Sequence, residues 1–132
     1  MGSCIFAAWG LSFDVDEFLK TTNLKPGFIY HKGEAVALER QPRPDTGFML
    51  AICQDDGEDL QFQFKEALRF LNVNEGELKR IRQFGAEDLR MVFSYPVVDM
   101  LQHSEFLPPK LVSLIGYLQM GIELTCFKAQ KP

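Results

Sequence analysis

The chain has 132 residues, of which 46% are hydrophobic and 24% are charged, and these values are ordinary for a globular protein. The length predicts a single domain over residues 1–132, and the composition excludes disordered and fibrous proteins. A net charge of −4 opposes the counterion release that drives most binding to nucleic acid, so we expect no nucleic-acid partner.

Neither a membrane span nor a targeting segment is predicted. The apolar run from Cys4 to Trp9 lacks a basic flank and stops at Gly10, short of the roughly 20 residues that a membrane span requires. The three cysteines, Cys4, Cys53 and Cys126, have no metal-binding or redox spacing, and each lies in an apolar strand pattern. We interpret them as reduced core residues and expect a cytoplasmic protein.

The chain begins with a strand and a short capped helix. Residues 4–9 are apolar on both faces, which is typical of a strand in the middle of a sheet. Asp14 and Glu17 have the spacing of a capping box, which predicts a helix that ends at Asn23 in the left-handed conformation. Residues 28–31 then form a second predicted strand.

The middle of the chain contains a loop, a strand and a long helix. Residues 41–47 include two prolines and a glycine, which excludes a helix or a sheet interior. Residues 48–53 are apolar on both faces and form a second candidate for the sheet centre. A single buried stripe predicts the helix, and its members are Leu60, Phe64, Ala67, Leu68 and Leu71.

Residues 74–85 fit two interpretations. As a helix, the segment has Asn74 as its cap, Gly85 as its terminator and basic residues in its last turn. As a strand, it would direct Leu78 and Ile81 to opposite faces. We predict a short helix, with the strand as the alternative.

The last part of the chain predicts a strand, a helix and a strand. Residues 89–95 alternate, residues 107–118 repeat the stripe of the first long helix, and residues 122–126 alternate again. Both long helices would then pack on one face of a mixed sheet of about five strands. The predicted fold class is α+β, a two-layer sandwich built from ferredoxin-like βαβ units.

Such a sandwich leaves the second face of its sheet open, and alternation places half-polar side chains there. The candidate binding residues on this face and beside the predicted loops are Trp9, His31, Arg40, Arg43, Arg90, Ser94, Glu123 and Thr125. Phe127 is a further open-face position. Trp9 ends a strand beside Gly10, and for it we favour a core position over the mouth of a pocket. The predicted contact loop runs from Arg40 to Gly47.

The sequence predicts no catalytic residue, metal site or cofactor. His31 and His103 are the two histidines, and neither has a ligand at helical i, i+4 spacing. Cys53 is not expected to act as a nucleophile, because the acidic turn at residues 55–59 would raise the pKa of its thiol. That turn also has Leu60 where a calcium-binding loop requires glycine.

Several segments carry a resemblance to a known family. They are the N-terminal strand, Asp14–Phe18, Asn23–Pro26, Lys32–Glu34, Leu107–Leu118 and Gly121–Leu124. With these features the chain resembles DUF4279, a bacterial family of unknown function, over nearly its full length. The resemblance implies no catalytic residues, because the family has no established catalytic motif.

We therefore expect a non-enzymatic cytoplasmic binding protein, and an immunity-type antagonist of a bacterial toxin is the leading hypothesis. Its acidic charge would steer it toward a basic partner, which the open sheet face and the contact loop would cover. Two alternatives stay open. One is a small-ligand sensor or enzyme with a pocket between helices and sheet near Trp9 or His31, and the other is a homodimer through the open face.

Overall fold

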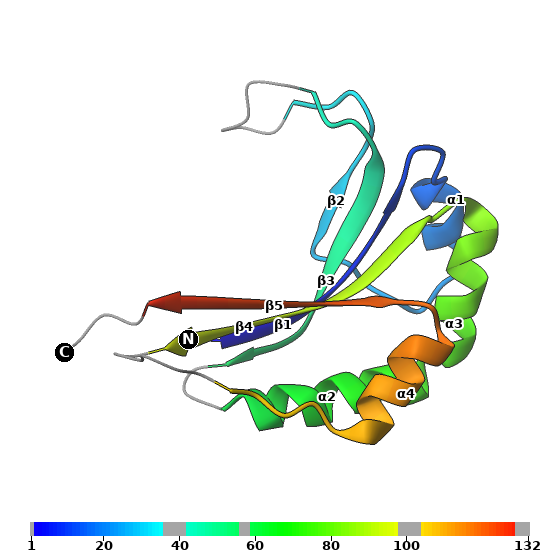
Figure 1. Ribbon diagram of the computed structural model, residues 1–132. Coiled ribbons are helices and arrows are strands. Elements are labelled where there is room, and N and C mark those ends of the chain that lie inside the picture. Colours follow the sequence, from blue (N-terminus) through cyan, green and yellow to red (C-terminus); the bar gives the residue numbers. More distant parts are fainter. Residues whose placement is uncertain (1, 36–41, 56–58, 98–103, 129–132) are drawn as a thin grey trace.

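The computed structural model describes residues 2–35, 42–55, 59–97 and 104–128, and in it helices cover one face of a five-stranded sheet (Figure 1). The strands are β1 (Gly2–Gly10), β2 (Phe28–Tyr30), β3 (Thr46–Asp55), β4 (Asp88–Val97) and β5 (Gly121–Lys128). The helices are α1 (Val15–Lys20), α2 (Leu60–Val73), α3 (Glu75–Arg80), the 3₁₀ helix η1 (Ile81–Phe84) and α4 (Pro109–Tyr117). This arrangement confirms the predicted α+β sandwich.

The strand order β2-β3-β1-β4-β5 places β1 in the middle of the sheet, as its apolar pattern predicts. β1 pairs antiparallel with both β3 and β4, and β2 pairs antiparallel with β3. The chain passes from β4 through α4 to the parallel strand β5, which makes one βαβ unit. β3, α2 and β4 make a second unit, which is split because β1 lies between its two parallel strands.

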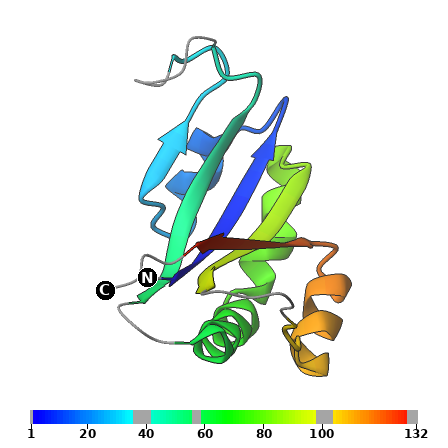
Figure 2. The ribbon, with the colours of Figure 1, turned by 60° about the vertical axis from the view of Figure 1, so that its left-hand side comes forward.

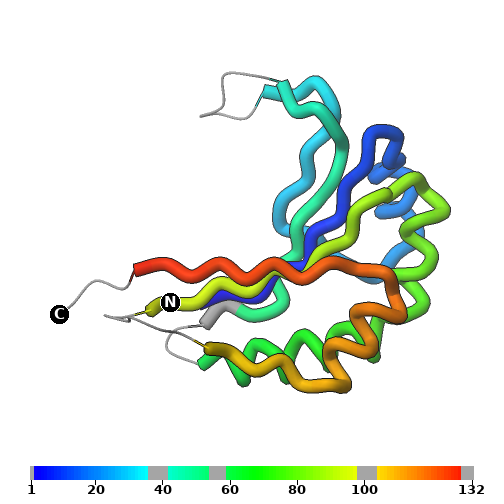
Figure 3. The backbone as a smooth tube through the Cα atoms, viewed as in Figure 1, coloured from blue at the N-terminus to red at the C-terminus, as the bar shows by residue number. Residues whose placement is uncertain are grey.

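The sheet is strongly curved, and its concave side faces away from the helices. In Figure 1, β2 and β3 rise steeply while β5 runs across the view, and the tube in Figure 3 follows the same bend. Figure 2 shows the strands from the side that the helices leave uncovered. None of the described helices has both the length and the apolar content that crossing a bilayer would require.

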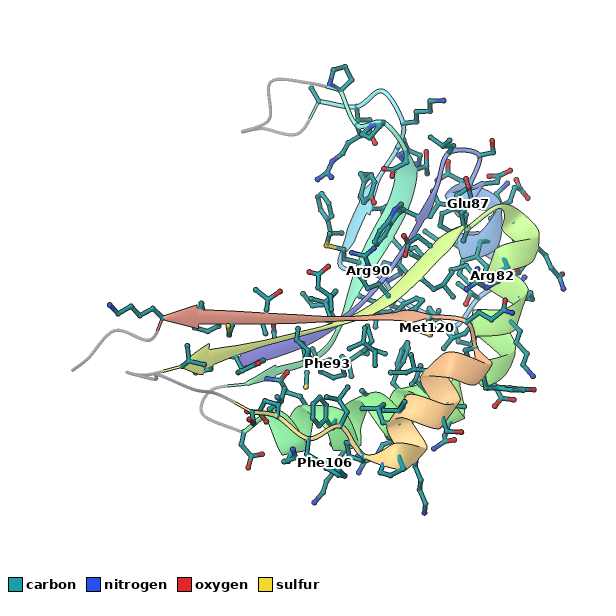
Figure 4. The ribbon with its side chains drawn as sticks, in the orientation of Figure 1. Arg82, Glu87, Arg90, Phe93, Phe106 and Met120 are labelled. Atoms are coloured by element: carbon teal, nitrogen blue, oxygen red, sulfur yellow. The ribbon has the colours of Figure 1, made fainter. Side chains whose placement is uncertain are left out.

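The core lies between the sheet and the helices. Alternate residues of the central strands are completely buried there, among them Phe6, Phe48 and Phe93. Phe93 meets Phe64 of α2 edge to face with 4.8 Å between ring centroids, and Figure 4 shows Phe93 directed from β4 toward α2. The amphipathic stripe of α2 therefore packs as its spacing predicts.

Local signals explain where several helices begin and end. The Asp14 carboxylate accepts a hydrogen bond from the Glu17 amide at 3.2 Å and so begins α1. The expectation that Asn23 ends this helix in the left-handed conformation is wrong, because α1 ends at Lys20 and Asn23 has no positive φ. Gly85 has a φ of 99°, and a Cβ there would lie 2.3 Å from the Ser12 carbonyl oxygen, so glycine is required.

Residues 74–85 are helical, which confirms the predicted helix over its strand alternative. α3 continues into η1, which ends at Phe84 with Gly85 as its C-cap. The sequence predicts that the Asn74 side chain caps α3, and this prediction is wrong. Asn74 Nδ2 instead donates to the Phe70 carbonyl at 2.9 Å and closes α2.

The three cysteines form no disulfide with one another, but they are not all core residues. Cys4 is fully buried, Cys53 is half-buried and Cys126 is exposed. The core interpretation is therefore wrong for Cys126. Its strand, β5, is an edge strand whose second half extends beyond α4, so its alternating pattern is not matched by burial (Figure 1).

The core predicts a measurable cost for removing one ring. Replacing Phe64 by alanine should lower the free energy of unfolding by about 3–5 kcal/mol, because the buried cavity cannot close fully. Chemical denaturation measures this change. Val73→Ala is the matched control, since Val73 is 75% exposed, and it should stay within about 0.5 kcal/mol of the parent. Equal effects of the two substitutions would contradict the placement of α2.

Candidate functional site

The side chains that point away from the helices form one continuous surface, here called the open face. Strand register defines it, because paired residues of neighbouring strands share a face. Its members are Ser3, Ile5, Ala7, Trp9, Phe28, Tyr30, Met49, Ala51, Asp88, Arg90, Val92, Ser94, Glu123, Thr125 and Phe127. Four of the candidate binding residues from β4 and β5 lie on it together, as their alternation predicts.

Arg90 connects the middle of the open face. Its guanidinium donates to Glu123 at 2.8 Å and to Asp88 at 3.3 Å. The same guanidinium lies over the Trp9 ring, 4.8 Å from the ring centroid. The hydrogen bond with Glu123 is the main reason why the pKa of Arg90 is raised, so the cation is held firmly between these partners. Figure 4 shows Arg90 on the concave side of the sheet.

Trp9 lies on the open face and is half-buried, so the core position favoured from the sequence is wrong. It borders a recess of about 240 Å³ at one end of β1, and three carboxylates line this recess with it: Asp45, Glu87 and Asp88. Glu87, labelled in Figure 4, accepts a hydrogen bond from the Leu11 amide at 2.9 Å. The recess therefore offers negative charge next to an aromatic ring, a pairing that suits a cation.

An apolar area lies on β2 and β3 at one end of the open face. Phe28 and Met49 are 41% and 37% exposed, whereas Tyr30 is buried. The guanidinium of Arg43 covers the Tyr30 ring at 4.5 Å, and burial is the main cause that raises the pKa of Tyr30. A Cβ on Gly47 would lie 2.7 Å from the Tyr30 hydroxyl, so this glycine lets the ring rest on β3.

The other end of the open face is polar. Ser94 and Ser3 share a hydrogen bond between their hydroxyl oxygens at 2.7 Å, across the β1–β4 pair. Thr125 Oγ1 donates to Glu123 at 3.5 Å. This end therefore combines neutral hydroxyl groups with the Glu123 carboxylate and with the ring of Phe127, which is 38% exposed.

His31 lies apart from the open face, beside α1. Its Nε2 is 3.0 Å from Asp16 and its Nδ1 is 2.9 Å from Glu34. These hydrogen bonds, the one with Asp16 first, raise the pKa of His31, and the side chain is 42% exposed. Both ring nitrogens face carboxylates, which favours the protonated form of His31. His103 and Arg40, and with Arg40 the start of the predicted contact loop, lie outside the described residues.

The described residues hold no group of three or more histidine, cysteine or acidic side chains that could bind a metal ion. Cys4 is a poor nucleophile, because burial, with a smaller contribution from Cys53 across the β1–β3 pair, raises the pKa of its thiol far above the ordinary value.

Comparison with protein families gives one match. The model of the family DUF4279, described as a domain of unknown function, matches residues 2–125. The chain belongs to the DUF4279 family. Neither the curated proteins nor the solved structures contain a match. Because the family model extends from β1 into β5, every strand of the open face belongs to the DUF4279 domain.

Phe28, Tyr30 and Met49 are open-face residues that the sequence alone did not reveal. Residues 48–53 are apolar on both faces, and this pattern predicts cover on both sides. The register places Met49 beside Phe28 on the side without helices, so it is exposed instead. Gly47 pairs with Tyr30, and its lack of a side chain leaves room for the Tyr30 ring over β3. This glycine is the signal for that contact in the sequence of this DUF4279 member.

The contact between Arg90 and the single tryptophan can be measured directly. Arg90→Ala should shift the fluorescence of Trp9 to longer wavelength and increase its quenching by acrylamide, because the indole loses its cover. The loss of stability should be about 1 kcal/mol, as expected for a partly exposed contact of this kind. Arg69→Ala on α2 is the control, and an identical spectrum for both variants would contradict the stacking.

The pKa of His31 gives a second test. NMR titration should place it above the ordinary value of 6.5, and Asp16→Asn should lower it, because the first of the two carboxylates is removed. The ion pairs stabilise the fold while His31 is protonated. Their contribution is complete below the unfolded-state pKa and is lost as the pH rises through the raised folded-state pKa. A His31 pKa that Asp16→Asn leaves unchanged would be inconsistent with this contact.

Proposed function

We propose that this chain is a non-enzymatic binding protein that holds a protein partner on its open face. The observation that carries the proposal is that no described helix covers this face, although it presents apolar side chains to solvent. Phe28 and Met49 are more than one third exposed, and Trp9 is half-buried beside them. Exposed apolar groups with a polar surround are typical of protein interaction sites.

The charges beside this surface favour a basic partner. Arg90 is already engaged by Asp88 and Glu123, so its charge is not available to attract an anion. The carboxylates of Asp45 and Glu87 line the recess next to Trp9. A lysine or arginine side chain of the partner would place its stem along the indole and its charge among these carboxylates. The net charge of −4 would speed the encounter with such a partner.

Within this class, an immunity-type antagonist of a bacterial toxin, acting in the cytoplasm, is the role that we propose. A small acidic protein that covers a basic surface neutralises it by occlusion and needs no catalytic group of its own. Cys4, Cys53 and Cys126 form no disulfide with one another, which agrees with a reducing compartment. A toxin gene beside the gene for this chain would supply the partner for direct measurement.

Site-specific crosslinking tests which surface is used. A photoreactive amino acid at Met49, on the open face, should crosslink the partner, whereas the same residue at Val73 should not, because Val73 lies at the end of α2. Sedimentation of the isolated protein separates this result from self-association. Crosslinking at Val73 alone would overturn the proposal, as would a dimer whose crosslink at Met49 joins two copies of this chain.

Charge steering makes a kinetic prediction. The double variant Asp45→Asn and Glu87→Gln should slow association with the basic partner several-fold, by about 3–10 times at low salt, and should weaken the salt dependence of the rate. Stopped-flow fluorescence of Trp9 measures it. Glu66→Gln with Glu77→Gln removes the same total charge from the helical layer and is the matched control. Equal rates for both double variants would exclude the recess from the encounter.

A further inference from the structure

A separate groove lies on the outer side of the helical layer, between α2 and α4, which Figure 1 and Figure 2 show side by side. It consists of two adjoining hollows of about 510 and 670 Å³, and both are lined by Leu68, Pro109 and Lys110. Each volume lies in the range of small-molecule sites. No residue of the groove belongs to the open face, so it is independent of the proposed function.

The walls of the groove are apolar. Phe64 and Leu111 line the groove and are buried. Leu68 and Leu114 also line it and are half-buried. Pro108 and Pro109 form one end, where Gln61 donates to the Phe106 carbonyl at 3.2 Å and holds the segment before α4 against α2. Figure 4 shows Phe106 near this end.

The charge of the groove is opposite to that of the whole chain. Its lining includes Lys65 from α2 and Lys110 from α4, and it includes no aspartate or glutamate. Both lysines are exposed, and neither forms an ion pair with a carboxylate of the described residues. In a chain with a net charge of −4, an apolar groove with cationic edges points to an apolar ligand that carries an anion.

The other end of the groove is lined by Tyr117, whose ring is held in place by Lys79. Tyr117 accepts a hydrogen bond from Lys79 at 2.6 Å, and the Lys79 ammonium also lies 4.6 Å from the centroid of its ring. Lys79 in turn pairs with Glu75 at 3.4 Å, so its charge is compensated. Among the described residues, the groove lysines without a paired carboxylate are therefore Lys65 and Lys110, whereas Lys79 has one.

We propose that the α2–α4 groove binds a single-chain amphiphile with a carboxylate head, of the fatty-acid class. The alkyl chain would lie along Leu68 and Leu114, and the carboxylate would accept hydrogen bonds from Lys65 and Lys110. A linear chain suits the groove because its two hollows adjoin and most of their lining is apolar. Two ammonium groups without a planar array of donors suit one carboxylate better than a larger polyanion.

Dodecanoate, used below its micelle concentration, is the probe that tests this site. Calorimetry should show one molecule per chain, and the methyl NMR signals of Leu68 and Leu114 should shift with it. The double variant Lys65→Gln and Lys110→Gln should weaken binding about tenfold or more, because two charge-assisted hydrogen bonds are lost. Lys25→Gln with Lys128→Gln removes the same charge elsewhere on the surface and should leave the affinity unchanged.

Other results would overturn the inference. These are the absence of binding, several molecules per chain without methyl shifts in the groove, and equal affinity in the two lysine variants. Tight binding of an acidic amphipathic peptide to the groove without binding of dodecanoate would identify it as a peptide site instead. Asp45→Asn with Glu87→Gln should leave dodecanoate binding intact, so failure here and failure of the open-face proposal are distinguishable.

Discussion

The structure depends on the pairing of β1 along both of its edges. Because β1 bonds to β3 and β4 together, its alternation sets which residues of three strands face the helices. Phe6 and Ala8 are buried on the helical side, and Ala7 and Trp9 lie on the other. A slip of one residue would exchange these sets and place the Trp9 side in the core, so burial of the phenylalanine side fixes the register and, with it, the open face.

The position of Arg90 shows how the sheet tolerates a cation on its open face. The side chain is only 34% exposed, and an arginine placed there without partners would be costly. Asp88 supplies one carboxylate from the same strand, and Glu123 supplies the other from the adjacent parallel strand. Trp9 covers the flat side of the guanidinium. The same contacts hold the indole at the border of the recess, so Arg90 positions Trp9 on the open face.

The order and type of the elements could be predicted from the sequence because each carries its own local signal, such as the Asp14 cap, the stripe of α2 and the glycine at position 85. The burial of a single residue could not be predicted where it depends on which other element covers that residue. Cys126 lies in an alternating strand pattern and Met49 in a strand that is apolar on both faces, and both patterns predict burial. Both residues are exposed because no described helix extends over them. The sequence placed Arg90 and Glu123 on one face, but the stacking on Trp9 follows from the β1–β4 register, which no local pattern contains.

The two surfaces lie on opposite sides of one sheet and share no side chain. The open face is built from strand residues that alternate away from the core, whereas the groove is built from the outer edges of α2 and α4. Phe64 links the groove to the core, since it lines the groove and packs against Phe93, whose neighbour Ser94 points to the open face. This pair is one of several contacts between α2 and the sheet, since α2 also packs against β1 and β3. A packed core resists small displacements, so a ligand in the groove would be expected to leave the open face unchanged.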